Sequence, residues 1–131
     1  MKKQFLAQKI GIKKIHCSDK KDLKKFFLRK KFYAIIHTAA LFANQKSIDQ
    51  PLEDLRSNVI GTLNLLEYAK NNKIKIINFS SSCVYSTPNT NEMIYKPSFD
   101  TPYAISKFSG EQYCSFSVSY THLTLPTIYS V

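Results

Sequence analysis

Blocks of apolar and polar residues alternate along the chain and predict strands and helices in turn. The run "YAIIHTAA" at 33–40 is continuously apolar and ends in small side chains, which is typical of a strand buried on both faces. The run "IKIINFSSS" at 74–82 has the same character and leads into a cluster of serines. Residues 13–17, "KKIHC", predict a weaker, shorter strand ahead of both.

Segments with helical spacing lie between these strands. The segment 19–31 predicts a helix capped by Ser18 or Asp19, with lysines on its wet face. A longer helix is expected to begin with Pro51 in its first turn, and another to cover residues 103 to about 114. Steps of three and four between apolar residues predict that the longer helix has an apolar face formed by Leu52, Leu55, Val59, Leu63 and Leu66.

The alternation of strands and helices predicts an α/β fold. We expect a partial doubly wound parallel sheet of the Rossmann-like kind, with right-handed crossovers. In such sheets ligands bind outside the carboxyl ends of the strands. Thr38 and Ala39 follow one predicted strand, and Ser80 to Ser82 follow another, so this edge of the sheet is where binding residues are expected.

Composition limits the classes of protein and partner. A chain of 131 residues with 44% hydrophobic and 13% aromatic content is expected to form one globular domain, and no apolar run has the length of a membrane span. The net charge of +10 comes entirely from residues 1–31, which hold twelve basic and two acidic side chains. A solvated helix face explains this basic run more simply than nucleic-acid binding does, although a nucleic-acid module stays as an alternative.

The cysteines and histidines indicate no metal centre. Three cysteines, an odd number without a CxxC pair, are typical of reduced thiols in a cytoplasmic protein. Neither a cysteine nor a carboxylate lies at ligand spacing from His37. His37 is therefore expected to be a hydrogen-bonded histidine at a strand end.

Tyr103 and Lys107 are the main candidates for chemistry. They stand four residues apart behind Pro102, so they share one face of the predicted helix. A nearby ammonium favours the phenolate and would lower the tyrosine pKa by about 1 to 3 units from about 10. Such pairs also occur on solvated helix faces, but Ser81 at a strand end could bind the same substrate hydroxyl. The three side chains would then have separate roles.

Four segments in this order carry a family resemblance: "IIHTAA" (35–40), "SNVIGTLNLLEYA" (57–69), "FSSSCVY" (79–85) and "PYAISKFSGE" (102–111). The run resembles the extended short-chain dehydrogenase/reductase superfamily, and within it the NAD-dependent epimerase/dehydratase family that includes UDP-glucose 4-epimerase. The resemblance implies a dinucleotide-binding sheet with a smaller C-terminal substrate lobe. It also implies hydride transfer at a carbon of a nucleotide sugar by bound NAD.

The resemblance implies a role for each matching residue. Tyr103 would be the general base, Lys107 would lower its pKa and hold the nicotinamide ribose, and Ser81 would orient the sugar hydroxyl. Without the resemblance, Ala39 and Ala40 would be explained by tight packing, and Asn58 as a tolerated polar residue of a helix. Besides Tyr103 and Lys107, the residues implied to bind the cofactor are Thr38, Ala39, Ala40 and Asn58.

The resemblance also bears on the subtype. Sugar dehydratases of this superfamily carry an acidic pair where this chain has Ser82 and Cys83, so an epimerase is favoured. A sugar dehydratase or reductase, or a non-catalytic dinucleotide-fold binding or regulatory protein, stays as an alternative. A homodimeric parent protein is also compatible with the resemblance.

Both ends of the chain depart from the family pattern. The family's Gly-rich phosphate turn has no counterpart, and no substrate lobe follows. Residues 1–117 are therefore expected to be a fragment of an NAD-binding domain, inactive as it stands. Residues 118–131, "VSYTHLTLPTIYSV", resemble translated sequencing-adapter DNA and are expected to be a non-native tail, with a genuine strand as the alternative.

Overall fold

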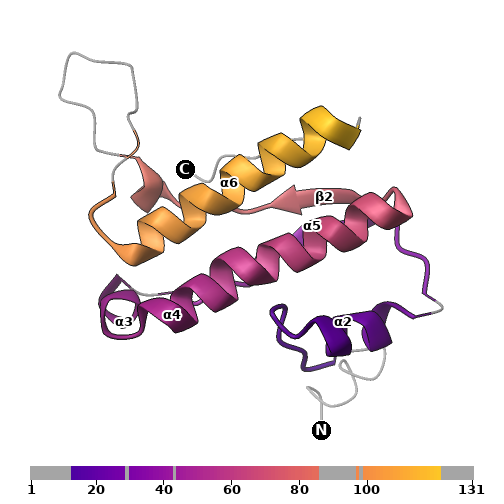
Figure 1. The fold of residues 1–131 in the computed structure, drawn as a ribbon, viewed down its shortest axis with the longest axis horizontal. Coiled ribbons are helices and arrows are strands. Elements are labelled where there is room, and N and C mark those ends of the chain that lie inside the picture. The colour runs from indigo at the N-terminus through magenta and orange to yellow at the C-terminus, as the bar shows by residue number, and fades with distance from the viewer. Residues whose placement is uncertain (1–12, 29, 43, 86–96, 98, 122–131) are drawn as a thin grey trace, which may run out of the picture.

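A computed structural model describes residues 13–28, 30–42, 44–85, 97 and 99–121, with the side chains described up to residue 117. Helices and two short strands alternate along this part of the chain (Figure 1). In chain order the elements are α2 (Lys20–Phe27), β1 (Ala34–His37), α3 (Asn44–Asp49), α4 (Pro51–Asp54), the π-helix η1 (Leu55–Ile60), α5 (Gly61–Asn72), β2 (Lys75–Asn78), the 3-10 helix η2 (Ser82–Val84) and α6 (Pro102–Thr121).

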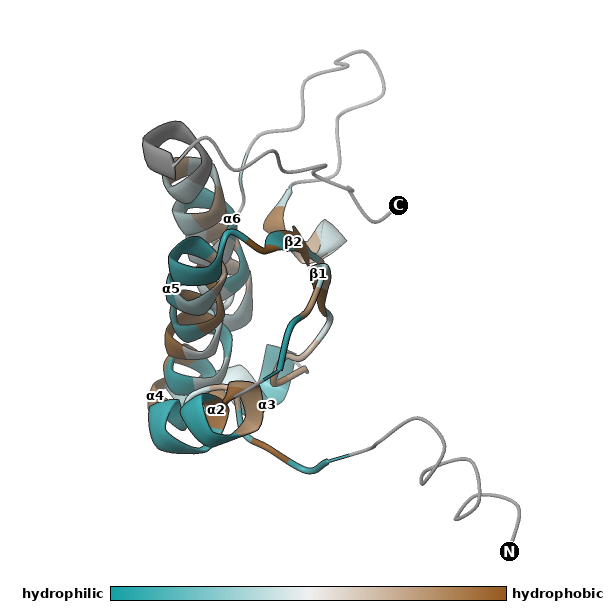
Figure 2. Ribbon diagram, turned by 90° about the vertical axis from the view of Figure 1, so that its right-hand side faces the viewer, coloured by the Kyte–Doolittle hydropathy of each residue, from teal (hydrophilic) through white to brown (hydrophobic). Residues whose placement is uncertain are grey.

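The sheet formed by the described residues has two parallel strands. Ala34 of β1 lies opposite Lys75 of β2, and His37 lies opposite Asn78. Helices α5 and α6 run side by side along one face of the sheet (Figure 2). The carboxyl ends of both strands therefore lie at the same edge, as the sequence predicts, and the fold is a partial α/β fold of the Rossmann-like kind.

The prediction of a strand at 13–17 is wrong. Residues 13–16 have no regular structure and Cys17 lies in a turn, although Ile15 and Cys17 still pack against the core. Helix α5 holds this segment instead of a neighbouring strand: the Asn64 amide donates a hydrogen bond to the Cys17 carbonyl at 3.0 Å. Close approach at this point suits Gly61, because a Cβ there would lie 3.1 Å from the Cys17 Cβ.

The long middle helix is present, but its buried face differs from the predicted one. Helices α4, η1 and α5 follow one another from Pro51 to Asn72 without a break. Leu52 is 82% exposed and Leu55 is 49% exposed, so the first two members of the expected apolar face meet solvent. The buried row is largely polar where it faces α6, and turns apolar only toward the end of the helix; its members include Asp54, Asn58, Thr62, Leu65, Leu66 and Ala69.

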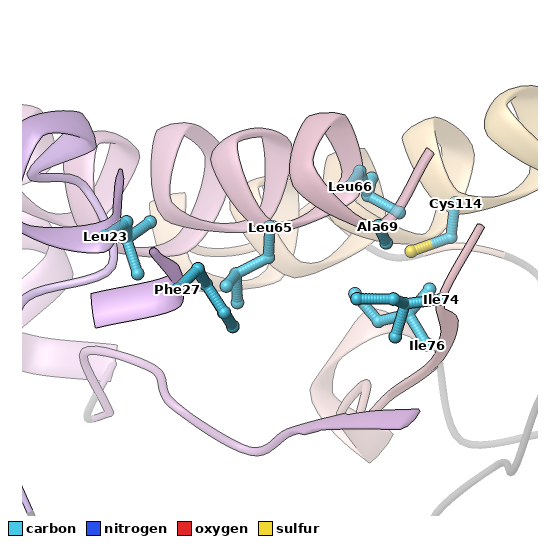
Figure 3. Close-up of a cluster of buried hydrophobic side chains, with 8 residues drawn as sticks. All are labelled: Leu23, Phe27, Leu65, Leu66, Ala69, Ile74, Ile76 and Cys114. Carbon is cyan, nitrogen blue, oxygen red and sulfur yellow. The ribbon is translucent and has the colours of Figure 1, made fainter. Parts of the chain in front are cut away.

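The apolar core joins three helices to the strand β2 (Figure 3). Two of its side chains come from α2, three from α5 and one from α6, and the others come from β2 and the residue that precedes it. Burial of such side chains stabilises the packing by about 25 cal/mol per Å² of apolar surface. The cluster consists of Leu23, Phe27, Leu65, Leu66, Ala69, Ile74, Ile76 and Cys114.

The strand β1 is not buried on both faces, contrary to the sequence-based expectation. Ile36 is 65% exposed, because the described helices that pack on the sheet lie on its other face. The last helix is longer than expected and runs from Pro102 to Thr121, so the backbone of residues 118–121 continues α6. The rest of the predicted tail lies outside the described residues. None of the helices in the described ranges is long and apolar enough to cross a membrane.

Candidate active site

Tyr103 and Lys107 lie in the first two turns of α6 and are both buried. Tyr103 is 4% exposed and Lys107 is 8% exposed, so the pair does not belong to a solvated helix face. The Tyr103 ring packs edge-on against Phe42, with the ring centroids 5.8 Å apart. The backbone amide of Tyr103 donates a hydrogen bond of 3.1 Å to the hydroxyl of Ser47 on α3. Helix α6 is thus held at its first turn by a side chain that sequence analysis did not identify.

Ser81 is hydrogen-bonded to the side chain of Tyr103, so the structure brings these two predicted residues together. Ser81 follows β2 in an extended conformation and caps η2, where its hydroxyl accepts a hydrogen bond of 3.3 Å from the Cys83 amide. Burial raises the pKa of Tyr103 above its usual value, and the hydrogen bond from Ser81 opposes that rise. The charges of Cys83 and Asp54 raise this pKa further.

The pKa of Tyr103 is raised and not lowered, and the lowering effect expected of Lys107 stays a prediction. The Lys107 ammonium instead donates a hydrogen bond of 2.6 Å to the backbone carbonyl of Phe79, at the end of β2. Burial lowers the pKa of Lys107, while Glu111, Cys114 in its ionised form at high pH, and Asp54 oppose that effect. Lys107 therefore ties α6 to the edge of the sheet where ligands are expected.

His37 is a hydrogen-bonded histidine at a strand end, as the sequence predicts. Its Nε2 lies 3.0 Å from the hydroxyl of Thr62, and that hydroxyl donates its only proton to the carbonyl of Asn58 at 2.6 Å. Nε2 must therefore be the donor toward Thr62. Burial, together with the charge of Lys107, lowers the pKa of His37 to about 4, so the ring is neutral at physiological pH.

Asn58 joins the middle helix to the loop after β1. Its side-chain oxygen accepts a hydrogen bond from the Leu41 amide at 2.7 Å, and its Nδ2 lies 3.3 Å from the Leu41 carbonyl. Nδ2 also donates to Asp54 at 2.8 Å and to Ser106 at 3.1 Å. Asn58 lies in the π-helix η1, a rare element that is frequent at functional sites. A direct contact between Asn58 and a cofactor stays a prediction, since its polar atoms already bind the protein.

Sequence analysis missed Ser47, Asp54 and Ser106. Each is buried, and each is hydrogen-bonded to Tyr103 itself or to a residue that contacts its helix. The one available signal was the i, i+4 spacing of Asp54 and Asn58, which allows a carboxylate to accept from an amide on the same helix face. The prediction of the buried helix face instead followed the apolar residues Leu52 and Leu55, which are exposed.

The edge of the sheet beside these residues fits a dinucleotide. Thr38 and Ala39 are exposed there, and their small side chains let a ligand approach the backbone. The Asn78 Oδ1 atom at the end of β2 and the Ser80 Oγ atom just after it are buried without a hydrogen-bond partner among the described residues. Buried polar atoms normally have a partner, and a polar ligand at this edge would supply one.

Comparison with known proteins identifies the family of the chain. The NAD dependent epimerase/dehydratase family matches residues 2–130. UDP-glucose 4-epimerase 2 of rice (Oryza sativa subsp. japonica) is 34% identical over 113 residues, which are 82% of this chain and 27% of the rice protein. The X-ray structure of Pal from Bacillus thuringiensis superposes with a TM-score of 0.82 at 27% identity, and the match covers 88% of this chain and 38% of Pal.

A second solved structure, the UDP-glucose 4-epimerase of Thermus thermophilus in complex with NAD, superposes with a TM-score of 0.77 at 25% identity. The match covers 85% of this chain and 37% of that protein. The chain therefore spans well under half of the length of these relatives. Since the family match includes almost every residue, the chain belongs to the NAD-dependent epimerase/dehydratase family.

Proposed function

We propose that the protein that carries this chain is an NAD-dependent nucleotide-sugar epimerase that inverts one hydroxyl-bearing carbon of a UDP-sugar. The hydrogen bond between the half-buried Ser81 and the buried Tyr103, with Lys107 one turn further along α6, is the observation that carries the proposal. Family membership supports it, and so do the names of the rice and Thermus thermophilus relatives, both UDP-glucose 4-epimerases. A protein that only bound a dinucleotide would have no need for a buried tyrosine aligned with a serine.

When bound beside Tyr103 and Lys107, NAD would supply reversible hydride transfer at the sugar carbon. Tyr103 removes the proton from the sugar hydroxyl as the carbon is oxidised, and gives it back as the carbon is reduced. Ser81 holds that hydroxyl in line with Tyr103, because its own hydroxyl already lies against the tyrosine side chain. Because its pKa is raised, Tyr103 is protonated before the ligands bind. A positively charged group of a bound ligand, or a hydrogen bond to the substrate, would then favour the phenolate.

Lys107 and the loop after β1 would hold the cofactor. Among the described residues, the ammonium of Lys107 donates one hydrogen bond, to the Phe79 carbonyl, and its other protons could be donated to the ribose hydroxyls of NAD. Thr38, Ala39 and Ala40 would lie along the dinucleotide, where small side chains avoid a clash. Asn58 fixes the position of this loop through Leu41.

Epimerisation is proposed in preference to dehydration. Loss of water from a sugar needs an added acid and base near the reacting carbons, and the residues that follow Ser81 are Ser82 and Cys83. Both side chains are exposed, and neither is a carboxylate. Reversible hydride transfer needs only Tyr103, Ser81 and the cofactor.

A homodimer is proposed for the whole protein. Large apolar side chains are exposed on two neighbouring helical segments. One segment consists of α4 and η1, and the other is α6, which packs against both. Large apolar side chains that are exposed on neighbouring helices support an interface with a second copy. Light scattering on the purified enzyme tests the proposal, since a monomeric mass would contradict it. The exposed residues are Leu52, Leu55, Ile60, Ile105, Tyr113 and Phe116.

The experiment uses the whole protein that carries this chain, which is called the complete enzyme below. It is incubated with NAD and UDP-glucose, and the sugar products are followed by NMR together with the absorbance of NADH. An epimerase produces the 4-epimer, UDP-galactose, with no net NADH. A 4-keto-6-deoxy product would indicate a dehydratase, steady accumulation of NADH a dehydrogenase, and NAD binding without turnover a binding protein. Each of those three results would overturn the proposal.

A further inference from the structure

Asp54 is a buried carboxylate that the proposed reaction does not use. It is the last residue of α4 and is 1% exposed, which is unusual for an aspartate without a close cationic partner. Within the described ranges, no ion pair of 4 Å or less includes it. Burial raises the pKa of the Asp54 carboxyl, and the hydrogen bonds of Ser106 and Asn58, together with the charge of Lys107, oppose that rise.

The contacts of Asp54 lead to the helix that carries the catalytic pair. Its Oδ1 accepts a hydrogen bond of 2.8 Å from Asn58, and its carboxylate is also hydrogen-bonded to Ser106. Ser106 stands between Tyr103 and Lys107 in sequence, and its hydroxyl oxygen lies 3.0 Å from the Tyr103 carbonyl, so this carbonyl and the Asp54 carboxylate share its one proton. Asn58 in turn binds both backbone polar groups of Leu41. One carboxylate thus connects the loop after β1 to the first turns of α6.

We propose that Asp54 is a positioning residue of the active site: through Asn58 and Ser106 it fixes the loop at Leu41 relative to Tyr103 and Lys107, and it supplies the negative charge that balances Lys107. The inference rests on the proposed function, because it assigns a role in that same site. A purely structural i, i+4 pair would need neither burial nor a hydrogen bond to α6, since such pairs are effective on exposed helix faces.

The charge of Asp54 acts on both members of the catalytic pair in a defined direction. It raises the pKa of Tyr103 and also raises the pKa of Lys107. Removal of the charge therefore favours the phenolate of Tyr103 and the neutral amine of Lys107. The other titratable groups that act on this pair are Cys83 on η2, His37 on β1, and Glu111 and Cys114 on α6.

The test compares two substitutions that remove the same charge. Asp54→Asn keeps an oxygen that can accept from Asn58, so it removes the charge with the least change in shape. Glu53→Gln removes a negative charge one residue away, from a side chain that is 42% exposed and pairs with His16 and Arg56. For each complete enzyme, kcat for UDP-glucose epimerisation is measured against pH.

Asp54→Asn is expected to lower kcat at least about tenfold and to move both limbs of the pH profile to lower pH by about half a unit or more. The acidic limb moves because Tyr103 ionises more easily, and the alkaline limb because Lys107 loses its proton earlier. Glu53→Gln is expected to keep the wild-type profile. A profile for Asp54→Asn that is lower but not shifted, or a shift of the same size in Glu53→Gln, would overturn the proposal.

Two further measurements keep the inference separate from the proposed function and from folding. If the wild-type enzyme has no epimerase activity, the ionisation of Tyr103 is measured directly from its absorbance as the pH is raised. The absorbance of the same protein carrying Tyr103→Phe is subtracted, so that only Tyr103 contributes to the difference. The midpoint must still move to lower pH in Asp54→Asn. If Asp54→Asn does not fold, Ser106→Ala keeps the charge and removes the connection to α6. It is expected to lower kcat several-fold with both limbs unmoved, and wild-type kcat would overturn the role of the network.

Discussion

The ammonium of Lys107 donates a hydrogen bond of 2.6 Å to the carbonyl of Phe79, which joins α6 to the end of β2. Phe79 itself continues the pairing of the sheet, because its amide donates to the His37 carbonyl at 3.1 Å. Lys107 is thus fixed relative to both strands. Helix α6 cannot rotate without breaking a charge-assisted hydrogen bond of a buried ammonium.

Substitution of Lys107 by methionine is expected to destabilise the complete enzyme by about 1 to 3 kcal/mol, the usual cost of leaving a buried hydrogen-bonding group without its partner. The Phe79 carbonyl would lose its donor, and Asp54 would lose its positive neighbour. Unfolding in urea measures the change. Lys70→Met, at an exposed position of α5, is the matched control and should change stability by less than about 0.5 kcal/mol. Equal effects of the two substitutions would refute the buried contact.

His37 is expected to make the protein less stable as the pH falls below about 6.5. Its pKa is about 4 in the folded protein, whereas an unfolded histidine has a pKa of about 6.5. The unfolded chain therefore binds more protons between these values, and stability falls as the pH is lowered through this window. The difference corresponds to about 3 kcal/mol in full.

His37→Gln, whose amide can still donate toward Thr62, should remove most of this acid sensitivity. His16→Gln serves as the control, because the His16 side chain is 52% exposed. Stability is measured by chemical denaturation at several pH values between 7 and 4. The explanation fails if His37→Gln and the wild type lose stability in parallel.

Lys73 at the end of α5 has a left-handed backbone conformation, with φ 54° and ψ 41°. A residue with a Cβ is strained in this region by about 1 to 2 kcal/mol, and glycine is not. Lys73→Gly is therefore expected to stabilise the protein by about 0.5 to 1 kcal/mol, after allowance for the greater freedom of glycine in the unfolded chain. Lys70→Gly, inside the same helix, should destabilise it by about 1 kcal/mol. Thermal unfolding of both variants would reveal a wrong sign for either one.

The predictable part of the fold consisted of features with strong local patterns. The apolar runs around β1 and β2 predict strands without any information on how the strands pair. The i, i+4 spacing of Tyr103 and Lys107 likewise predicts that both lie on one helix face. Residues 13–17 carry a similar but weaker pattern. They do not form a strand, because a strand needs a neighbour, and Ile15 and Cys17 instead pack partly buried against the core, where the Asn64 amide binds the Cys17 carbonyl.

The polar support of the site could not be predicted in the same way. Asp54 and Asn58 have the pattern of surface residues on an amphipathic helix, because nothing local reveals that α6 and the Leu41 loop cover them. Burial also decided the electrostatics: desolvation outweighs the other effects on Tyr103, so its pKa rises where the sequence predicts a fall. Both features depend on contacts between segments that are distant in sequence.

The role of Tyr103 as the general base is the central claim, and the variant Tyr103→Phe tests it most directly. The variant lacks only the hydroxyl, and the packing of the ring against Phe42 remains. Turnover of UDP-glucose by the complete enzyme is expected to fall at least about a hundredfold, the scale for loss of a positioned acid–base group. NAD binding and the unfolding transition should stay near those of the wild type. Turnover close to the wild-type value, in a folded variant that binds NAD, would contradict the account.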